Sequence, residues 1–127
     1  SLKKPLIPVH HLRSHIAANY ITNKELKPPF LCLLVSGGNT VLAEVTDYTK
    51  FKILGGTRDD AAGECFDKAA RCMGLEYPGG VNLDRVATKA DTKKYPLPHP
   101  SVSSGEFDFS FSGLKTAVMN LVNNSAQ

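Results

Sequence analysis

The sequence lacks the features of several protein classes. Its three cysteines, Cys32, Cys65 and Cys72, are odd in number and have no CxxC spacing, which supports neither a disulfide framework nor a zinc knuckle. No apolar run approaches the ~20 residues that span a bilayer, and the opening SLKKPLIPVHH lacks the hydrophobic segment of a signal peptide. We therefore expect a cytoplasmic protein that does not enter a membrane.

A strong charge of either sign is also missing. Lys and Arg outnumber Asp and Glu by 15 to 12, a mild excess compared with dedicated nucleic-acid-binding proteins. The charge therefore permits an RNA partner without predicting one. The 127 residues, 42% of them hydrophobic, suffice for one modest core. Because the chain starts at Ser1 and ends directly after a helical pattern, we expect a segment of a larger protein.

The apolar pattern predicts an α/β fold with a small sheet. The unbroken run FLCLLV suits a strand buried on both faces, and glycine-containing turns join it to two further strand-like runs. Together they predict a three-stranded antiparallel meander with strands at 30–35, 41–47 and 51–56. The segment FDFSF at 107–111 alternates like a fourth strand, after a proline-rich loop at 91–105.

Helical periodicity accounts for most of the remaining chain. Val9, Leu12, Ile16 and Tyr20 share one side of a predicted helix at 9–20. A second helix is predicted at 58–73, with Thr57 and Asp60 as a capping box. Two more are expected after the Pro-Gly-Gly turn at 78–80 and from Ser112, which can act as the cap of the last helix.

Two histidines are candidate metal ligands. His11 and His15 are four residues apart, on one face of the first predicted helix and within reach of one ion; the alternative is two polar residues beside a core. A zinc peptidase would need a glutamate where Leu12 follows His11. A catalytic site typically takes three protein ligands, and His99 lies in a proline-rich loop, so we expect a third ligand outside this chain.

A Gly-Gly turn is the first candidate for nucleotide binding. Two glycines at the end of the first strand allow backbone amides to approach a phosphate, with a serine hydroxyl beside them. Most such turns are simple hairpins, so the pattern alone is weak. The residues concerned are Leu34, Val35, Ser36, Gly37 and Gly38.

Two further candidates lie beyond it. Asp60, Glu64 and Asp67 share one side of the second predicted helix; a solvated face with Glu64–Lys68 and Asp67–Arg71 ion pairs is the alternative interpretation. Gly80 and Asp84 lie at the start of the next helix, where free backbone amides suit an anion or a ribose hydroxyl.

The order of these segments is more specific than any one of them. VHHLRSHIAANY, LVSGGNT, GGTRDDAAGECFDKAARCMGLEYPGG and FDFSFSGLKTA resemble consecutive blocks of the TsaD family of tRNA threonylcarbamoyltransferases, formerly described as O-sialoglycoprotein endopeptidases. The resemblance covers essentially residues 8–118. It departs from the family pattern at Arg13-Ser14, at Asn39, where histidine is common, and at Val81, where proline is usual.

The resemblance implies a fold and a site. Family members have an actin/hsp70-like ATPase fold of two lobes with sheets of ribonuclease-H type, so residues 1–127 would be a partial domain from the centre of such a protein. His11 and His15 would bind one divalent metal ion, Fe²⁺ or Zn²⁺. The residues implied to contact threonylcarbamoyl-adenylate are Leu34, Val35, Ser36, Gly37, Gly38, Asp67, Gly80 and Asp84.

The resemblance also implies a reaction. The threonylcarbamoyl group would pass from its adenylate to N6 of the adenosine 3′ of the anticodon, in tRNAs reading codons that begin with A, with AMP leaving. A TsaB-like paralogue and, in bacteria, a TsaE-like ATPase are implied partners. We expect the chain by itself to be inactive. Alternatives are a non-catalytic assembly module of the same fold, a metallopeptidase, and a related carbamoyl transferase with an HxxxH helix.

Overall fold

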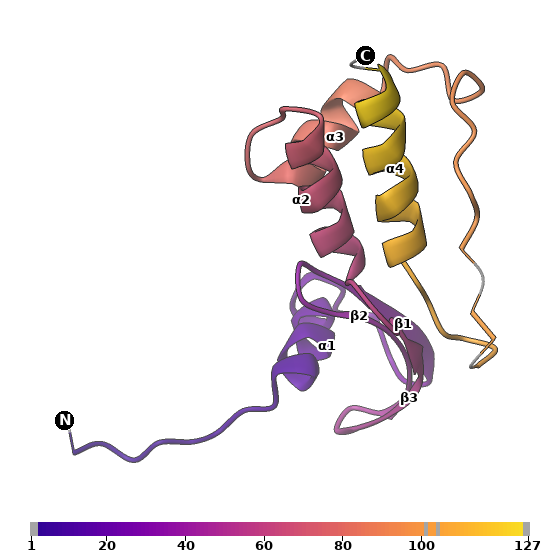
Figure 1. Cartoon of the computed structure of the whole chain (residues 1–127). Helices are drawn as coiled ribbons and strands as arrows, with labels where there is room; N and C mark the ends of the chain where they lie inside the picture. Colours follow the sequence, from indigo (N-terminus) through magenta and orange to yellow (C-terminus); the bar gives the residue numbers. More distant parts are fainter. Residues whose placement is uncertain (1–2, 101, 104, 126–127) are drawn as a thin grey trace.

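Two groups of elements follow one another along the chain. The computed structural model describes residues 3–100, 102–103 and 105–125. Helix α1 (His11–Thr22) and strands β1 (Phe30–Val35), β2 (Thr40–Asp47) and β3 (Lys50–Gly56) form the first group, the sheet half. Helices α2 (Ala62–Cys72), α3 (Gly79–Ala87) and α4 (Ser112–Ser125) form the second, the helical half. In Figure 1 the helical half stands above the sheet half.

The predicted three-stranded meander is confirmed. The strands pair antiparallel in the order β1-β2-β3, with Cys32 opposite Ala43 and Val45 opposite Phe51. Register shifts in the β2–β3 ladder at Leu42/Ala43 mark a bulge, which adds local twist. The α/β class is thus correct for the described residues.

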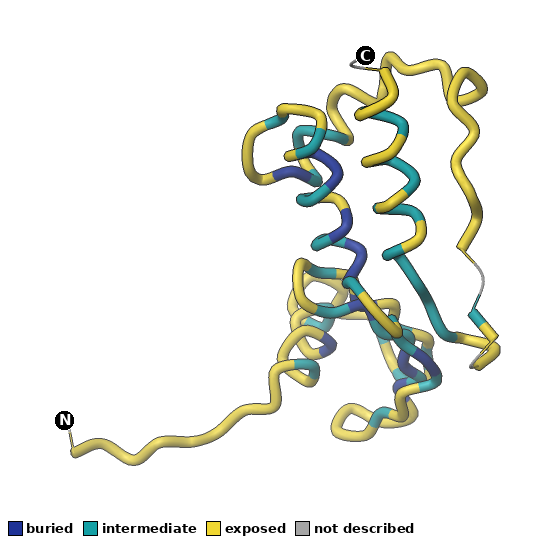
Figure 2. The backbone as a smooth tube through the Cα atoms, viewed as in Figure 1, coloured by how far each residue is buried: buried dark blue, intermediate teal, exposed yellow. Residues whose placement is uncertain are grey.

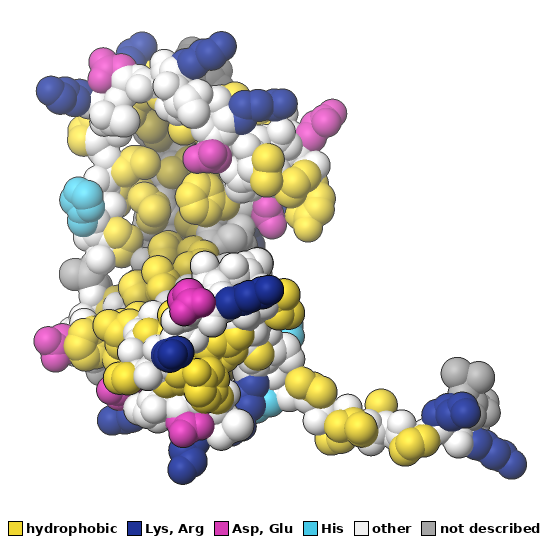
Figure 3. All heavy atoms as spheres, turned by 180° about the vertical axis from the view of Figure 1, so that it is seen from behind, with side chains coloured by type: hydrophobic (Ala, Val, Ile, Leu, Met, Phe, Trp, Pro, Cys, Tyr) yellow, Lys and Arg dark blue, Asp and Glu magenta, His cyan; other side chains and the backbone are white. Residues whose placement is uncertain are grey.

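One face of this sheet is covered and the other is bare. Leu34, Ala43 and Val45 are buried beside Ile16 of α1. Leu31 and Leu33, which alternate with them along β1, are 65% and 57% exposed. The expectation that β1 is buried on both faces is therefore wrong for this chain, because successive side chains point to opposite faces and α1 covers one of them. Apolar side chains gather on the sheet half in the view from behind (Figure 3).

Helix α1 begins two residues later than predicted. Val9 precedes it and is 72% exposed, whereas Ile16 is buried and Leu12 and Tyr20 are half-buried. No helix in the described ranges has the length and hydropathy to cross a bilayer. All three cysteines are free.

The helical half packs around a narrow stripe of small residues. Cys65, Ala69 and Ala70 of α2 are buried (Figure 2), and α3 and α4 both pack on α2. The predicted start at residue 58 is wrong, since α2 begins at Ala62. The capping box is wrong too, because the Thr57 hydroxyl donates to the backbone carbonyl of Asp60 and no side chain caps α2 from Ala61.

The segment FDFSF does not form the predicted strand. Phe109 makes a single parallel bridge to Thr57, in which its N–H donates to the Gly56 carbonyl and its carbonyl accepts from the Arg58 N–H. Its neighbours Asp108 and Ser110 bond residues 56–59 through their side chains instead. The predicted loop is confirmed where it is described, since 91–100, 102–103 and 105 contain no helix or strand.

Candidate substrate and metal site

The two predicted metal ligands are brought together on α1. The Nε2 atoms of His11 and His15 lie 3.2 Å apart, and both side chains are exposed. Two nitrogens bound to one tetrahedral zinc at about 2.0 to 2.1 Å are separated by about 3.3 to 3.4 Å. The observed separation is close to that value. Among the described residues no group of three His, Cys, Asp or Glu side chains is placed to hold a metal.

Neighbouring side chains of α1 are turned toward the sheet. The guanidinium of Arg13 donates to the carbonyl of Thr49 at 2.8 Å and lies 5.7 Å from the centre of the Phe51 ring. The His10 ring meets the same Phe51 edge-on at 5.9 Å. Arg13, a departure from the family pattern, is thus engaged by the β2–β3 hairpin.

The Gly-Gly turn is open to solvent. Ser36 and Asn39 close it, because the Ser36 N–H donates to the Asn39 carbonyl at 2.8 Å and the Asn39 N–H donates to the Ser36 hydroxyl oxygen at 3.0 Å. Gly37 and Gly38 are exposed, and a Cβ added at either would meet nothing within 4 Å. The glycines leave room above the turn for a ligand to approach the backbone. The Leu34 side chain is buried in the core. Only the backbone of Leu34 is therefore available to contact a ligand at the turn.

This turn is attached to the start of α2. The Ala62 N–H donates to the hydroxyl of Thr40, which is 2% exposed, and the Gly63 N–H donates to the Ser36 carbonyl at 3.2 Å. The first N–H groups of a helix have no partner within the helix. The β1–β2 hairpin satisfies two of them and so fixes the turn against α2.

Asp67 continues the same side of α2. It lies four residues after Gly63, one turn along the helix and a rise of about 6 Å. Its Oδ1 accepts the Gly79 N–H at 2.9 Å, which brings the start of α3 beside it. The Ser36–Gly38 turn and Asp67 thereby lie along one side of α2, and Gly80 follows the glycine that Asp67 binds. Asp84 is exposed on α3, and its side chain makes no hydrogen bond to another described residue.

The acidic residues of this region have different roles from those predicted. Glu64 forms the expected ion pair with Lys68 at 2.7 Å, but Asp67 bonds Gly79 and makes no ion pair with Arg71 in the described structure. Asp60 precedes α2, but its carboxylate binds the same Lys68 ammonium group as Glu64.

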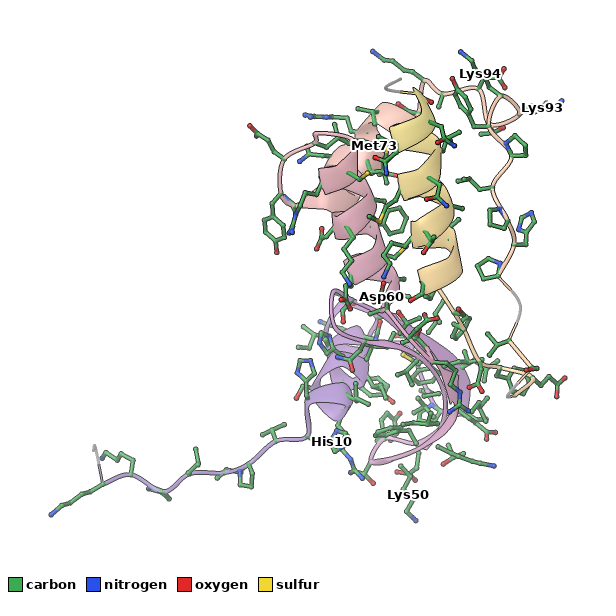
Figure 4. All side chains as sticks on the ribbon, viewed as in Figure 1. His10, Lys50, Asp60, Met73, Lys93 and Lys94 are labelled. Carbon is green, nitrogen blue, oxygen red and sulfur yellow. The ribbon has the colours of Figure 1, made fainter. Side chains whose placement is uncertain are left out.

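Asp60 instead sits at the junction of the two halves (Figure 4). It binds Lys68 at 3.2 Å and Lys115 of α4. The hydrogen bond from Lys115, helped by Lys68, lowers the pKa of Asp60 despite its burial.

Asp59 is a structural residue that the sequence pattern missed. Its Oδ1 accepts the N–H groups of Phe111 at 2.7 Å and Ser112 at 3.3 Å, and its Oδ2 accepts the Ser110 hydroxyl. Burial raises the pKa of Asp59, but these hydrogen bonds outweigh it and the net shift is downward. Asp59, not Ser112, therefore caps α4. Asp59 lies 52 residues before Phe111 in the chain, so the residue spacing around the start of α4 gives no indication of this cap.

A second missed residue locks the same two segments. Asp108 accepts the Gly56 N–H at 3.2 Å and the Arg58 Nε at 2.7 Å. A Cβ added at Gly55 would lie 2.0 Å from the Phe107 carbonyl oxygen, so a side chain there would collide with backbone. Hydrogen bonds and ion pairs thus join residues 55–60 to residues 107–115. We call these two joined segments the polar lock.

Comparisons with known proteins agree with the order of the motifs. A family model described as "TsaD: tRNA N6-adenosine threonylcarbamoyltransferase" matches residues 1–127. A protein named tRNA N6-adenosine threonylcarbamoyltransferase from Clostridium perfringens (strain SM101 / Type A) is 53% identical over 123 residues, 97% of this chain and 36% of that protein. One of the same name from Clostridium botulinum (strain Hall) is 51% identical over 120 residues, 94% of this chain and 35% of that protein. The chain thus spans about a third of the length of these curated relatives.

Proposed function

This chain belongs to the TsaD family of tRNA N6-adenosine threonylcarbamoyltransferases, and we propose that it supplies the adenylate-binding face and two metal ligands of such an enzyme. The observation that supports this most directly is that the Ser36–Gly38 turn and the start of α3 are both bonded to one side of α2, through Gly63 and Asp67. The proposed reaction transfers threonylcarbamoyl from its adenylate to N6 of the adenosine 3′ of the anticodon in tRNAs reading ANN codons.

In this proposal the residues of the chain bind and orient the adenylate. Gly37 and Gly38 are exposed and have open space at the Cβ position, so a phosphate could approach their backbone amides. Asp67 Oδ1 is held by Gly79, which leaves Oδ2 for a ribose hydroxyl. Fixing the adenylate in line with N6 lowers the entropic part of the barrier. N6 then forms a bond to the carbamoyl carbon and gives up one proton to solvent, the bond from that carbon to the phosphate oxygen breaks, and AMP leaves.

The metal role rests on the histidine geometry. The 3.2 Å separation of the Nε2 atoms fits Fe²⁺ or Zn²⁺ held by His11 and His15, with the remaining ligands from outside this chain. When bound, the ion supplies Lewis-acid stabilisation of charge on the carbamoyl oxygen. Two ligands predict weak binding by the chain alone, measurable by calorimetric titration with Zn²⁺ and lost in His15→Ala.

We further infer the context of the segment. The three-stranded meander is compatible with one lobe of an actin/hsp70-like fold. tRNA, a TsaB-like paralogue and, in bacteria, a TsaE-like ATPase are the partners expected of a full-length family member in the cytoplasm. The isolated chain carries one face of the proposed site, so we expect it to be inactive.

A non-catalytic assembly module is the second candidate. The bare sheet face, with Leu31 and Leu33 more than half exposed, favours a chain that contacts another protein surface. The close approach of the His11 and His15 rings favours the enzyme. A peptidase gains no support, because Leu12 stands where its general base would be.

Transfer of labelled threonylcarbamoyl from its adenylate to unmodified tRNA tests the proposal. The assay uses a full-length family member carrying this segment, with its partners, and compares wild type with the His11→Ala/His15→Ala double variant. Activity should fall by more than about 100-fold, because outer-shell partners of metal ligands alone contribute about 10- to 100-fold. His10→Ala is the matched control, since that ring packs on Phe51. A folded, adenylate-binding wild type without transfer would favour the assembly module.

A further inference from the structure

We propose that Gly63 and Gly79 are positioning residues of the candidate site, whose missing side chains let two segments approach the same side of α2. This inference rests on the proposed function and deepens it. Neither glycine is among the residues implied to contact the adenylate. Both have negative φ, since Gly74 is the one described glycine with a positive φ. Their requirement is therefore for space and not for an unusual backbone conformation.

At Gly63 the close neighbour is the turn itself. A Cβ added there would lie 2.6 Å from the Ser36 carbonyl oxygen, 2.7 Å from its carbonyl carbon and 2.8 Å from the Gly37 nitrogen. All three are backbone atoms, which cannot rotate away as the end of a flexible side chain can. The Ser36–Gly37 peptide therefore rests directly on α2, and any side chain at 63 would displace it.

At Gly79 the close neighbour is the aspartate. A Cβ added there would lie 2.6 Å from the Asp67 Cα, 2.8 Å from the Ala70 Cβ and 2.9 Å from the Asp67 Oδ1. The same approach allows the Gly79 N–H to donate to Oδ1 at 2.9 Å. Gly79 thus orients the Asp67 carboxylate and places the adjoining Gly80 beside it.

The two contacts lie on one stripe of the helix. Positions 63, 67 and 70 follow the spacing i, i+4, i+7, which is one face of an α-helix. Gly63 receives the turn and Asp67 with Ala70 receives α3. The two glycines therefore set the distance between the phosphate-facing turn and the carboxylate, and alanine at either position would change it.

Alanine variants of a full-length family member carrying this segment test this by thermal unfolding, by ¹H–¹⁵N NMR of the Gly37 and Gly38 amides, and by titration with AMP. Gly113→Ala is the matched control, because Gly113 lies in the first turn of α4 and a Cβ there would meet nothing within 4 Å. Alanine is normally the better helix former. Gly63→Ala should instead lower the melting temperature, shift both amide resonances and weaken AMP binding by about tenfold or more.

Gly79→Ala should lower the melting temperature and weaken AMP binding while leaving the Gly37 and Gly38 resonances nearly in place, because its clash is with Asp67. A Gly63→Ala protein that gains stability like Gly113→Ala and keeps both resonances would overturn the proposal. So would variants that shift the resonances but bind AMP as wild type does. If wild type fails to bind AMP, the proposed function fails, while the resonance shifts still report whether Gly63 seats the turn.

Discussion

The two halves of the molecule are held together in different ways. The sheet half uses strand ladders and one covered face, with Val45 at 1% exposure and Ile16 of α1 at 5%. The helical half buries mainly alanines, such as Ala69 and Ala70, and small side chains bury little apolar area each. Its attachment to the sheet depends on the polar lock. We call the junction of the two halves the seam; the candidate site meets it where the Gly63 N–H of α2 donates to the Ser36 carbonyl, so this contact both joins the halves and shapes the site.

The largest expected effect is in the sheet core. Val45→Ala should destabilise the chain by about 2 kcal/mol, because the lost methyl groups leave a cavity beneath α1. Val35→Ala is the matched control, since Val35 is 53% exposed on the adjacent strand, and it should change stability by less than about 0.5 kcal/mol. Urea unfolding measures both. Equal losses would show that the bare face is packed in solution.

Next in size is the cap of α4. Asp59→Ala removes the acceptor for the Phe111 and Ser112 N–H groups and should cost about 1 kcal/mol, the usual value of a helix cap. Hydrogen exchange should accelerate in α4 and leave the β1–β2 ladder unchanged. Equal acceleration in both regions would contradict a division into two halves. Ser103→Ala, in the exposed loop, serves as the control.

Acid should weaken the seam before it weakens the sheet. The folded-state pKa values of Asp59 and Asp60 are lowered, so these carboxylates stabilise the fold above their unfolded pKa of about 3.9. That contribution is lost as the pH falls from about 4 through the lower, folded pKa values. Stability measured from pH 6 to pH 2 should decline less steeply in an Asp59→Asn/Asp60→Asn variant. Parallel curves would refute this linkage.

The smallest expected effect is at the surface of α2. Glu64 and Lys68 have side chains 42% and 41% exposed, and solvent screens such pairs. Glu64→Gln should leave the melting temperature unchanged within error, in contrast to Asp59→Ala. A clear loss would mean that Glu64 contributes to the seam through the Lys68–Asp60 contact.

Local patterns predicted the elements well and their ends poorly. The strands at 30–35 and near 41–47 and 51–56 were recoverable because alternation and glycine turns are local signals. The start of α2 was misplaced by four residues, since Thr57 has the composition of a cap but bonds the Asp60 carbonyl before the helix begins. FDFSF alternates like a strand, yet its polar side chains bond the TRDD segment instead of extending a ladder.

The sequence by itself determined the family, the three-stranded meander and the candidate residues, because motif order and periodicity are written in neighbouring residues. His11 and His15 needed only helical spacing to become a pair. The tertiary structure alone decided that Asp59 caps a helix 52 residues away, that Asp67 bonds Gly79 rather than Arg71, and that one face of β1 is bare. Those outcomes depend on which segments come into contact in the folded chain. Backbone groups need hydrogen-bond partners, but the periodicity of the sequence does not indicate which distant segment supplies them.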